Sequence, residues 1–485
     1  MSKRAVFICL YLYVICPLYS RTISPIEYGL LEAKNDLERY EVLLKTHEAA
    51  VSAGYEITYE GIKQIIIEIP ASFKSIPLPK CTDFAGVELV VRNNTNHVFL
   101  FTMEQRRRKV EIPKSIYQKA GYEKIPVLEN DSKLLIIEDK KPWVKKRKGH
   151  DYGAMRKDVI FIENGSAVNV PVQSYSTRDS SPKFYYVIVT KEQKQICNLI
   201  ITRSKDSKYR TNCIKILNQN NVLLKNITIN TPVCDLTGDR AIVVNNATNI
   251  RLEDVTINGT YSKTNKSGYG ISLNNVWNIT FMRLKANGNW GVFGNNNVNK
   301  AVLEECDINR FDIHCYGRDV YCRNTVFRNL YNQFSSFYGT LSFDSCSFLN
   351  FVPVLFESSY AAYTHFNLII KDCNIQIDPK RPYLINAGNI ETFKGARREL
   401  SKVQWPDVEM KNIMINVDKQ VDTMSIFHVG GSEDLIVDGI RAVEMNNVTF
   451  LNTTPKVVFS NKQIKTRKKV TVNQIRCDFN KLNLN

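Results

Sequence analysis

Hydrophobic and polar residues alternate in short runs that recur along the second half of the chain. Each run has two apolar positions two residues apart, a polar bend, and two more apolar positions. Successive clear copies begin about 19 to 29 residues apart, a spacing typical of stacked repeats. The clear copies are Val222-Leu224-Ile227-Ile229, Ile250-Leu252-Val255-Ile257, Ile279-Phe281-Leu284-Ala286, Ala301-Leu303-Cys306-Ile308, Val320-Cys322-Thr325-Phe327, Leu341-Phe343-Cys346-Phe348 and Leu368-Ile370-Cys373-Ile375. Looser copies follow at Val408-Met410-Ile413-Ile415, Val443-Met445-Val448-Phe450 and Val470-Val472-Ile475-Cys477.

The bend in each copy falls on the residue before the third apolar position, and most residues there are polar and suited to corners. Asn in particular tolerates the left-handed backbone conformation and can hydrogen-bond to the backbone at a corner. Short β segments without helical periodicity predict a coil of parallel strands, whose equivalent residues stack about 4.8 Å apart. The bend residues are Asn226, Asp254, Arg283, Glu305, Asn324, Ser345 and Asp372, and the predicted inward column is Ile227, Val255, Leu284, Cys306, Thr325, Cys346 and Cys373.

This repeat pattern resembles that of the pectate-lyase-like superfamily of right-handed parallel β-helix proteins, over about residues 190–480. The resemblance implies an all-β solenoid fold and carbohydrate as the class of substrate. Neither the paired-Asp and Gly-His-Gly pattern of polygalacturonase-like hydrolases nor the acidic calcium cluster of pectate lyases is found in register. The resemblance therefore implies a fold and a substrate class, and assigns no catalytic residue.

Residues 1–20 have the layout of a secretory signal peptide, with Lys3 and Arg4 ahead of an apolar run and Ser20 before a cleavage point. The apolar run is shorter than the roughly 20 residues that a permanent membrane helix needs. We therefore expect a secreted, periplasmic or cell-surface protein with no integral membrane segment once the signal is removed. Cys16 as a lipid-anchor cysteine is the alternative.

Residues 21–60 are expected to form a capping α-helix, with Ser24 as N-cap, Pro25 at the first position and Glu27 completing a capping box. The helix is predicted from Pro25 to Ala53, and its apolar stripe should cover the open end of the coil. Residues 61–189 are expected to be an irregular mixed β-rich region or elaborated first turns, and residues 190–480 the β-helix. The predicted stripe is Ile26, Leu30, Ala33, Leu37, Tyr40, Leu44, His47 and Val51, with His47 as a core residue and not a ligand.

The chain carries a net charge of +17 and has a pI near 9.2, which favours an acidic partner. Basic clusters occur at residues 106–109, 140–148 and 465–469, although any of them could be a solvated loop. Export argues against nucleic acid, and no helix-turn-helix, RNA-binding or zinc-finger spacing is found. The expected partner is therefore an acidic polysaccharide, bound by a monomer.

Cysteine usage predicts neither a disulfide framework nor a zinc site. Several cysteines fall at inward repeat positions, where a buried thiol behaves as a small hydrophobe. Cys346 and Cys373, one turn apart, are the only pair close enough to test for a disulfide. We expect no cofactor; calcium stays open as a ligand, without a clear ligand cluster.

The densest group of reactive side chains lies near residue 312. Asp312, His314 and Tyr316 alternate with Ile313 and Cys315, so they should share the outward face of a strand. In the catalytic hypothesis, Asp312 tunes His314, His314 or Tyr316 moves a proton, and a neighbouring arginine neutralises a substrate carboxylate. The arginines are Arg310 and Arg318, and the groove residues expected to bind substrate are Asn295, Asn296, Phe337, Glu357 and Trp290.

The function predicted from these features is cleavage of an acidic, uronate-containing polysaccharide by β-elimination. A glycoside hydrolase using a carboxylate pair and a non-catalytic glycan-binding or surface-structural protein remain alternatives. A salt-bridge ladder on a solenoid face is the structural alternative for the cluster itself. Nothing in the sequence specifies the glycan. The predicted register aligns His314 with Val243, Ser272, Phe293, Ser335 and Leu355.

Overall fold

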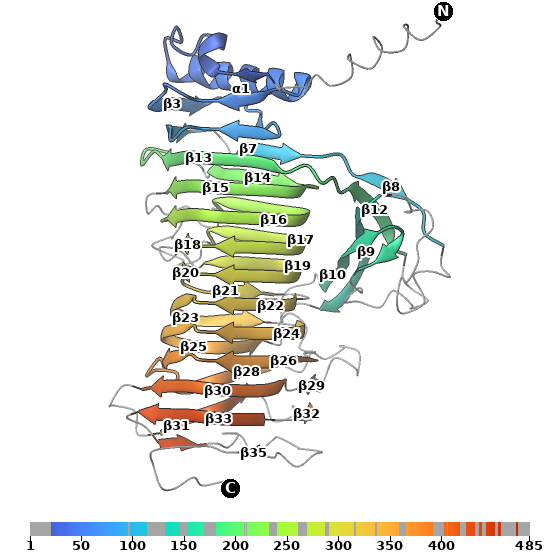
Figure 1. Ribbon diagram of the computed structural model, residues 1–485, viewed down its shortest axis with the longest axis vertical. Helices are drawn as coiled ribbons and strands as arrows, with labels where there is room; N and C mark the ends of the chain where they lie inside the picture. Colours follow the sequence, from blue (N-terminus) through green and yellow to red (C-terminus); the bar gives the residue numbers. More distant parts are fainter. Residues whose placement is uncertain are drawn as a thin grey trace, which may run out of the picture.

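Parallel strands stack into a right-handed β-helix that runs the length of the molecule, with a helical cap at one end and a small sheet at its side (Figure 1). The computed structural model describes residues 21–95, 98–113, 131–145, 153–168, 181–207, 209, 211–231, 240–259, 269–286, 291–314, 317–334, 337–357, 365–390, 402–404, 406–417, 423–431, 436–438, 443–451, 454–456 and 472–473. Within these ranges, 28 strands belong to one parallel sheet.

The parallel sheet begins close to the start of the described chain. Its first strands are β1 (Thr22–Ile23), β2 (Glu56–Thr58), β3 (Gln64–Ile69), β4 (Ile76–Pro77), β5 (Cys81–Asp83), β6 (Glu88–Asn93) and β7 (Val98–Glu104). The central turns contain β13 (Lys194–Arg203), β14 (Thr211–Leu217), β15 (Asn220–Asn230), β16 (Ile242–Asn258), β17 (Ile271–Met282), β18 (Lys285–Ala286), β19 (Val292–Glu304), β20 (Asp307–Ile308), β21 (Phe311–Ile313), β22 (Gly317–Arg323), β23 (Val326–Phe334) and β24 (Phe337–Asp344). The last turns contain β25 (Ser347–Glu357), β26 (His365–Lys371), β27 (Asn374–Gln376), β28 (Tyr383–Ile390), β30 (Asp407–Asn416), β31 (Thr423–Gly431), β33 (Val443–Leu451), β34 (Thr454–Lys456) and β35 (Val472–Asn473). A separate pair is formed by β29 (Lys402–Gln404) and β32 (Ile436–Asp438).

The register of the coil follows the repeats read from the sequence. Residues at the same repeat position pair from turn to turn, and their side chains are buried. Apolar burial of this kind contributes about 25 cal/mol per Å² of surface removed from water, so each column is a continuous source of stability. The second repeat position forms the column Leu224, Leu252, Phe281, Leu303, Cys322, Phe343, Ile370 and Met410. The predicted inward column is likewise buried: Ile227, Val255, Leu284, Cys306, Thr325, Cys346 and Cys373.

The predicted bend residues turn the coil by taking up the left-handed conformation. Asn226, Arg283 and Glu305 have φ values of 53°, 54° and 54°. Asn residues at such corners also pair between turns, as when the Asn226 side-chain amide donates to Asn198 Oδ1 at 3.0 Å. In the left-handed conformation, Cβ lies too close to the following carbonyl oxygen, which costs free energy. A long side chain such as that of Glu305 has this cost without the hydrogen bond that an Asn side chain forms.

Replacing Glu305 with Asn is therefore expected to raise the free energy of unfolding by about 0.5–1 kcal/mol. Glu305 is exposed, and its ion pair with Arg283 spans 4.0 Å, so little is lost. The midpoint of urea unfolding measures the effect, with Glu304→Asn, one residue earlier and outside the left-handed region, as the control. An unchanged or lower midpoint for Glu305→Asn would show that the corner carries no such strain.

The N-terminal cap consists of two helical segments and not of one continuous helix. Ser24 forms the predicted capping box, but the 3-10 helix η1 (Pro25–Tyr28) ends at Gly29, whose φ is +91°. Asn35 then caps a new helix, α1 (Asp36–Ala53), by accepting from the Glu38 amide at 2.9 Å. The prediction of a single helix from Pro25 to Ala53 is wrong, because Gly29 leaves the helical conformation after one turn.

The buried face of α1 differs accordingly from the predicted stripe. Tyr40 and His47 are buried as expected, whereas Leu37 and Val51 are 40% and 48% exposed. The helix lies on β3 and β4 of the first turns, where the Tyr40 hydroxyl donates to the Lys74 carbonyl at 2.6 Å. It thus lies at the N-terminal end of the coil (Figure 1).

The strands described between residues 61 and 189 divide between two sheets. β3 to β7 pair within the parallel sheet, so parallel pairing starts well before residue 190, the predicted beginning of the β-helix. A five-stranded antiparallel sheet, here called the inserted sheet, then interrupts the coil between β7 and β13 and lies beside it (Figure 1). Its strands are β8 (Arg108–Val110), β9 (Lys133–Lys145), β10 (Gly153–Glu163), β11 (Ser166–Ala167) and β12 (Lys183–Ile188).

One apolar face of the inserted sheet packs on the outside of the coil. The Phe161 ring stacks on Trp277 of β17, with ring centroids 4.6 Å apart and planes 1° from parallel. Beside this stack, the side-chain amide of Asn297 donates to the Lys157 carbonyl. These contacts hold the sheet against the turns formed by β16, β17 and β19.

The cysteines of the inward column are free thiols. Cys346 and Cys373, the pair that the sequence left to be tested, are both buried and unbridged. Cys306 and Cys322 are also free, and burial raises the pKa of the Cys306 thiol to about 11. In this column the thiols act as small apolar side chains.

Candidate functional site

Asp312 lies in β21 at the centre of a closed network of hydrogen bonds. Its Oδ2 accepts from Arg310 Nε at 2.5 Å and from the Tyr269 hydroxyl at 2.5 Å. Its Oδ1 accepts from the backbone amide of Gln333 at 3.0 Å. The tyrosine comes from the chain ahead of β17 and the amide from β23, so the turns of β17, β21 and β23 supply the network, with the β19 turn between the first two.

This network is buried, and the predicted exposure of Asp312 is wrong. The Asp312 side chain is fully buried, and that of Arg310 is only 3% exposed. The rings of Tyr269 and Tyr331 lie 5.7 and 4.8 Å from the Arg310 guanidinium and cover it. Burial raises the pKa of the Asp312 carboxyl, while Arg310 opposes the shift. The geometry is that of a structural ion pair, because Arg310 and Asp312 are hydrogen-bonded within the network and shielded from solvent.

The predicted strand register is shifted by two residues. Asp312, and not His314, pairs with Phe293 on one side and with Gln333 on the other. His314 lies beyond the end of β21, where its backbone amide donates to the Gly294 carbonyl at 2.8 Å. Its side chain is partly exposed. A shift by two residues keeps each side chain on its face, but it moves His314 out of the predicted column.

The predicted groove is only partly described, and one of its residues is in the core. Phe337 is fully buried, with its ring 5.3 Å from that of Phe334 and 5.2 Å from that of Phe366. The prediction that Phe337 binds substrate on the outer face of the coil is therefore wrong. Arg318 is partly exposed and pairs with Asp319 at 3.5 Å. Tyr316 and Trp290 lie outside the described residues, as do the side chains of Asn295, Asn296 and Glu357.

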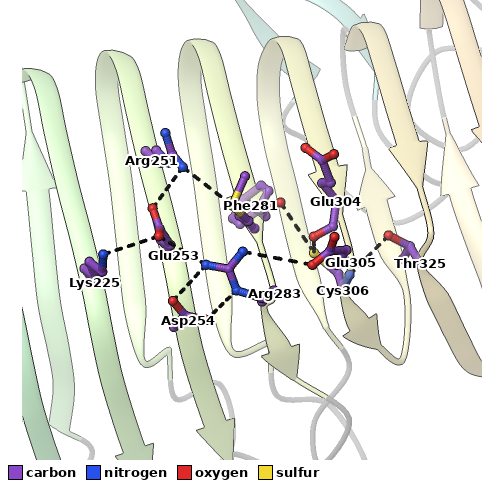
Figure 2. Close-up of polar contacts among 11 residues, drawn as sticks. Lys225, Arg251, Glu253, Asp254, Phe281, Arg283, Glu304, Glu305, Cys306 and Thr325 are labelled. Carbon is purple, nitrogen blue, oxygen red and sulfur yellow. Dashed lines mark hydrogen bonds and ion pairs between the residues drawn. The ribbon is translucent and has the colours of Figure 1, made fainter.

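A second group of charges lies on the outer face of β15, β16 and β17 (Figure 2). Glu253 pairs with Arg251 at 2.9 Å, with Arg283 at 3.1 Å and with Lys225 at 3.5 Å. Arg283 also binds Asp254 at 2.6 Å, and this hydrogen bond lowers the pKa of the Asp254 carboxyl. Because its cations are paired with acids, this ladder offers little free positive charge to a ligand.

A basic cavity lies where the inserted sheet joins the coil. Its volume is about 720 Å³, within the range of about 300–1,000 Å³ that is usual for ligand pockets. Four consecutive cations from the end of the β7–β8 connection and from β8 meet the end of β12 there. We call it the basic pocket, and its lining residues are Gln105, Arg106, Arg107, Arg108, Lys109, Tyr185, Tyr186 and Ile188.

One of the four cations is neutralised and held in place. Arg107 pairs with Glu138 of β9 at 2.8 Å, and its guanidinium carbon lies 3.9 Å from the centroid of the Tyr185 ring. Lys109 is 3.9 Å from the exposed Glu111, at the limit of an ion pair. Within the described part of the chain, neither Arg106 nor Arg108 pairs with an acid, and both are exposed. The pocket thus has a net positive charge.

The sequence pointed to part of this pocket and missed the rest. Residues 106–109 stand out as a basic cluster, with a solvated loop as the alternative. Tyr185 and Tyr186 carry no such signal, because they meet the cluster only through the antiparallel pairing of β12 with β8. That pairing sets Tyr185 opposite Lys109 and Tyr186 opposite Arg108.

Two further features were sought among the described residues. No three His, Cys, Asp or Glu side chains of this part of the chain come together in a way that suits a metal ion. Neither of the described helices combines the length and hydropathy of a membrane-spanning segment.

Comparison with known proteins finds similarity at the level of structure alone. No family model and no curated protein sequence matches the chain. The tailspike protein gp49 from Pseudomonas phage LKA1 superposes with a TM-score of 0.55 and 11% identity, over 92% of this chain and 84% of that one. The gp54 tailspike of Acinetobacter baumannii bacteriophage AP22, solved in complex with A. baumannii capsular saccharide, gives a TM-score of 0.51 and 10% identity, over 94% and 76%. The chain therefore shares the parallel β-helix fold of these proteins, as its repeats predicted.

Proposed function

We propose that the protein is an exported β-helix protein that binds an acidic polysaccharide in the basic pocket. The observation that carries this proposal is the cavity of about 720 Å³ lined by four consecutive cations, of which only Arg107 has a close acidic partner among the described residues. Arg106 and Arg108 have planar guanidinium groups that suit the carboxylates of uronate residues.

The aromatic residues of the pocket support an anionic and not a neutral ligand. The Tyr185 ring is stacked against Arg107, and the Tyr186 ring has the Lys133 amine 5.9 Å from its centroid. Both rings therefore orient cations, which leaves hydrogen bonds and ion pairs as the main source of affinity. The AP22 tailspike, which has the same fold and was solved with a capsular saccharide, lends support to a glycan as the ligand.

Cleavage of the polysaccharide remains a prediction and is not part of this proposal. Asp312 is enclosed by Arg310, Tyr269 and the Gln333 amide, so it is poorly placed to tune His314 for β-elimination. A binding role needs no contribution from that network. The proposal therefore rests on the pocket alone, and the same assay can test cleavage separately.

Affinity electrophoresis in gels that contain polygalacturonate should retard the protein, whereas gels with neutral dextran should not. The double substitution Arg106→Ala with Arg108→Ala should lower the affinity for polygalacturonate by about tenfold or more and reduce the retardation accordingly. The reason is that hydrogen bonds to charged groups contribute about 1.5–3 kcal/mol each. The control is Lys205→Ala with Lys411→Ala, two exposed lysines outside the pocket that change the net charge by the same amount. Equal retardation of the two double variants would contradict the proposal. New unsaturated ends in the eluted polymer would reveal cleavage.

A further inference from the structure

One corner of the coil holds both connections of the inserted sheet. On the incoming side, the backbone amide of Gln105 donates to the Leu217 carbonyl at 3.2 Å. On the outgoing side, Lys194 Nζ donates to Gln219 Oε1 at 2.5 Å. Leu217 is the last residue of β14, and Gln219 lies between β14 and β15. The segment 217–221, here called the clamp corner, thus fixes the sheet at the point where the basic pocket opens.

Asn220 is the centre of the clamp corner. Its Nδ2 donates to the carbonyl of Ile188, the last residue of β12, at 2.9 Å. Its Oδ1 accepts from the Thr190 backbone amide at 3.0 Å. The side-chain amide of the neighbouring Asn221 donates to the Thr190 carbonyl. Both halves of the Asn220 amide are therefore used to hold the chain as it leaves the inserted sheet.

In this contact Asn220 differs from the corner asparagines that pair within the coil. Asn218, Asn246 and Asn275 pair with one another from turn to turn, at 3.0 and 2.9 Å, and stabilise the coil itself. Asn220 is equally buried but directs its amide outward to the inserted sheet. Its stabilising bonds are made to the pocket wall and not to the next turn.

We propose that Asn220 is the positioning residue of the basic pocket, an inference that rests on the proposed function. Ile188 lines the pocket, and Tyr185 and Tyr186 precede it by three and two residues on the same strand. Fixing the Ile188 carbonyl fixes the end of β12 and, through its pairing with β8, the cations of residues 108 and 109. Since affinity for a charged ligand depends on how well such groups are held, loss of Asn220 should weaken binding without removing any ligand contact.

Calorimetric titration with an oligogalacturonate tests this role. Asn220→Ala should weaken binding by about tenfold, because the two lost hydrogen bonds to the backbone of Ile188 and Thr190 contribute about 0.5–1.5 kcal/mol each to the position of the pocket wall. Asn220→Asp keeps the acceptor for Thr190 but sets a buried carboxylate against the Ile188 carbonyl, so its affinity should be no higher than that of the alanine variant. Thr248→Val is the matched control, since Thr248 is the partner of Asn220 in the next turn, is equally buried, and has a hydroxyl that makes no hydrogen bond within the described residues.

Titrations are run well below the unfolding temperature of each variant, so that a loss of stability alone leaves the affinity unchanged. Thr190→Pro is the alternative variant if Asn220→Ala does not fold. Proline has no amide hydrogen, so this substitution at an exposed residue removes the Thr190 donor to Asn220 Oδ1 and should weaken binding as well. Wild-type affinity in a folded Asn220→Ala or Thr190→Pro variant would overturn the positioning role and leave the proposed function intact. Absence of binding by the wild type would overturn both.

Discussion

Replacing Arg310 with methionine is expected to lower the free energy of unfolding by about 3–5 kcal/mol, the usual effect of removing one partner of a buried ion pair. The Asp312 carboxylate would then be left without its cation at a fully buried position. The Tyr269 hydroxyl and the Gln333 amide would still donate to it, but they carry no charge. The loss should be smaller at acidic pH, because burial raises the pKa of Asp312 and protonation removes the unpaired charge.

Urea unfolding at neutral pH measures this loss, and Arg318→Met serves as the control. Arg318 is about one-third exposed and pairs with Asp319 at 3.5 Å, so its loss should change stability by under about 1 kcal/mol. Combining Arg310→Met with Asp312→Asn should restore much of the stability, since no buried charge remains. A stability for Arg310→Met equal to that of Arg318→Met would mean that Asp312 is accessible to solvent, as the catalytic hypothesis requires.

Acidification from about pH 6.5 to pH 4 is expected to remove about 3 kcal/mol of stability through His47 alone. His47 is completely buried in α1, and burial lowers its pKa to about 4. The Pro77 carbonyl, 2.9 Å from Nδ1, can only accept, so Nδ1 carries the proton and Nε2 accepts from the Tyr59 hydroxyl at 2.7 Å. The unfolded chain binds a proton near pH 6.5 and the folded chain does not, so stability is full above that pH and falls below it.

The pH dependence of urea unfolding for the wild type and for His47→Gln tests this expectation. Glutamine does not titrate, so the variant should be less stable at pH 7 but should lose less stability between pH 6.5 and pH 4. Other groups titrate in both proteins and cancel in the comparison. Identical slopes for the two proteins would show that His47 is protonated in the folded state, and hence that water reaches it beneath the cap.

The coil was predictable from sequence because its signal is repeated and local. Each turn places the same kinds of side chain at the same positions, so Leu224, Leu252 and Phe281 had to stack once the strands were parallel. The cap was less predictable: the Ser24 N-cap was predicted, but the second N-cap, Asn35, was not. Gly29 is compatible with a helix interior in a sequence pattern, and only its φ of +91° shows that the first segment ends there.

The surroundings of Asp312 could not be predicted by alternation alone. Alternation correctly placed Asp312 on the outer side of its strand, but it does not tell what covers that side. The cover comes from Tyr269, 43 residues earlier, and from Tyr331 in the following turn. The turn lengths differ between these positions, which also explains the two-residue error in register at His314.

The basic pocket was partly predictable from the sequence, less so than the coil and more so than the surroundings of Asp312. Its cations are adjacent in sequence and were visible as a cluster, whereas Tyr185 and Asn220 reach it through strand pairing and through a corner of the coil more than 100 residues from Arg106. A sequence pattern does not predict these long-range contacts unless the topology of the inserted sheet is known. The net charge of the sequence therefore predicted an acidic ligand, and the structure was needed to locate the basic pocket.

The structure of the protein in complex with an oligogalacturonate is the most direct test of the pocket as the glycan site. We predict ordered sugar in the cavity lined by residues 105–109 and 185–188, with carboxylates paired to Arg106 and Arg108. Sugar ordered beside His314, with the basic pocket empty, would contradict the account and restore the coil surface near β21 as the functional site.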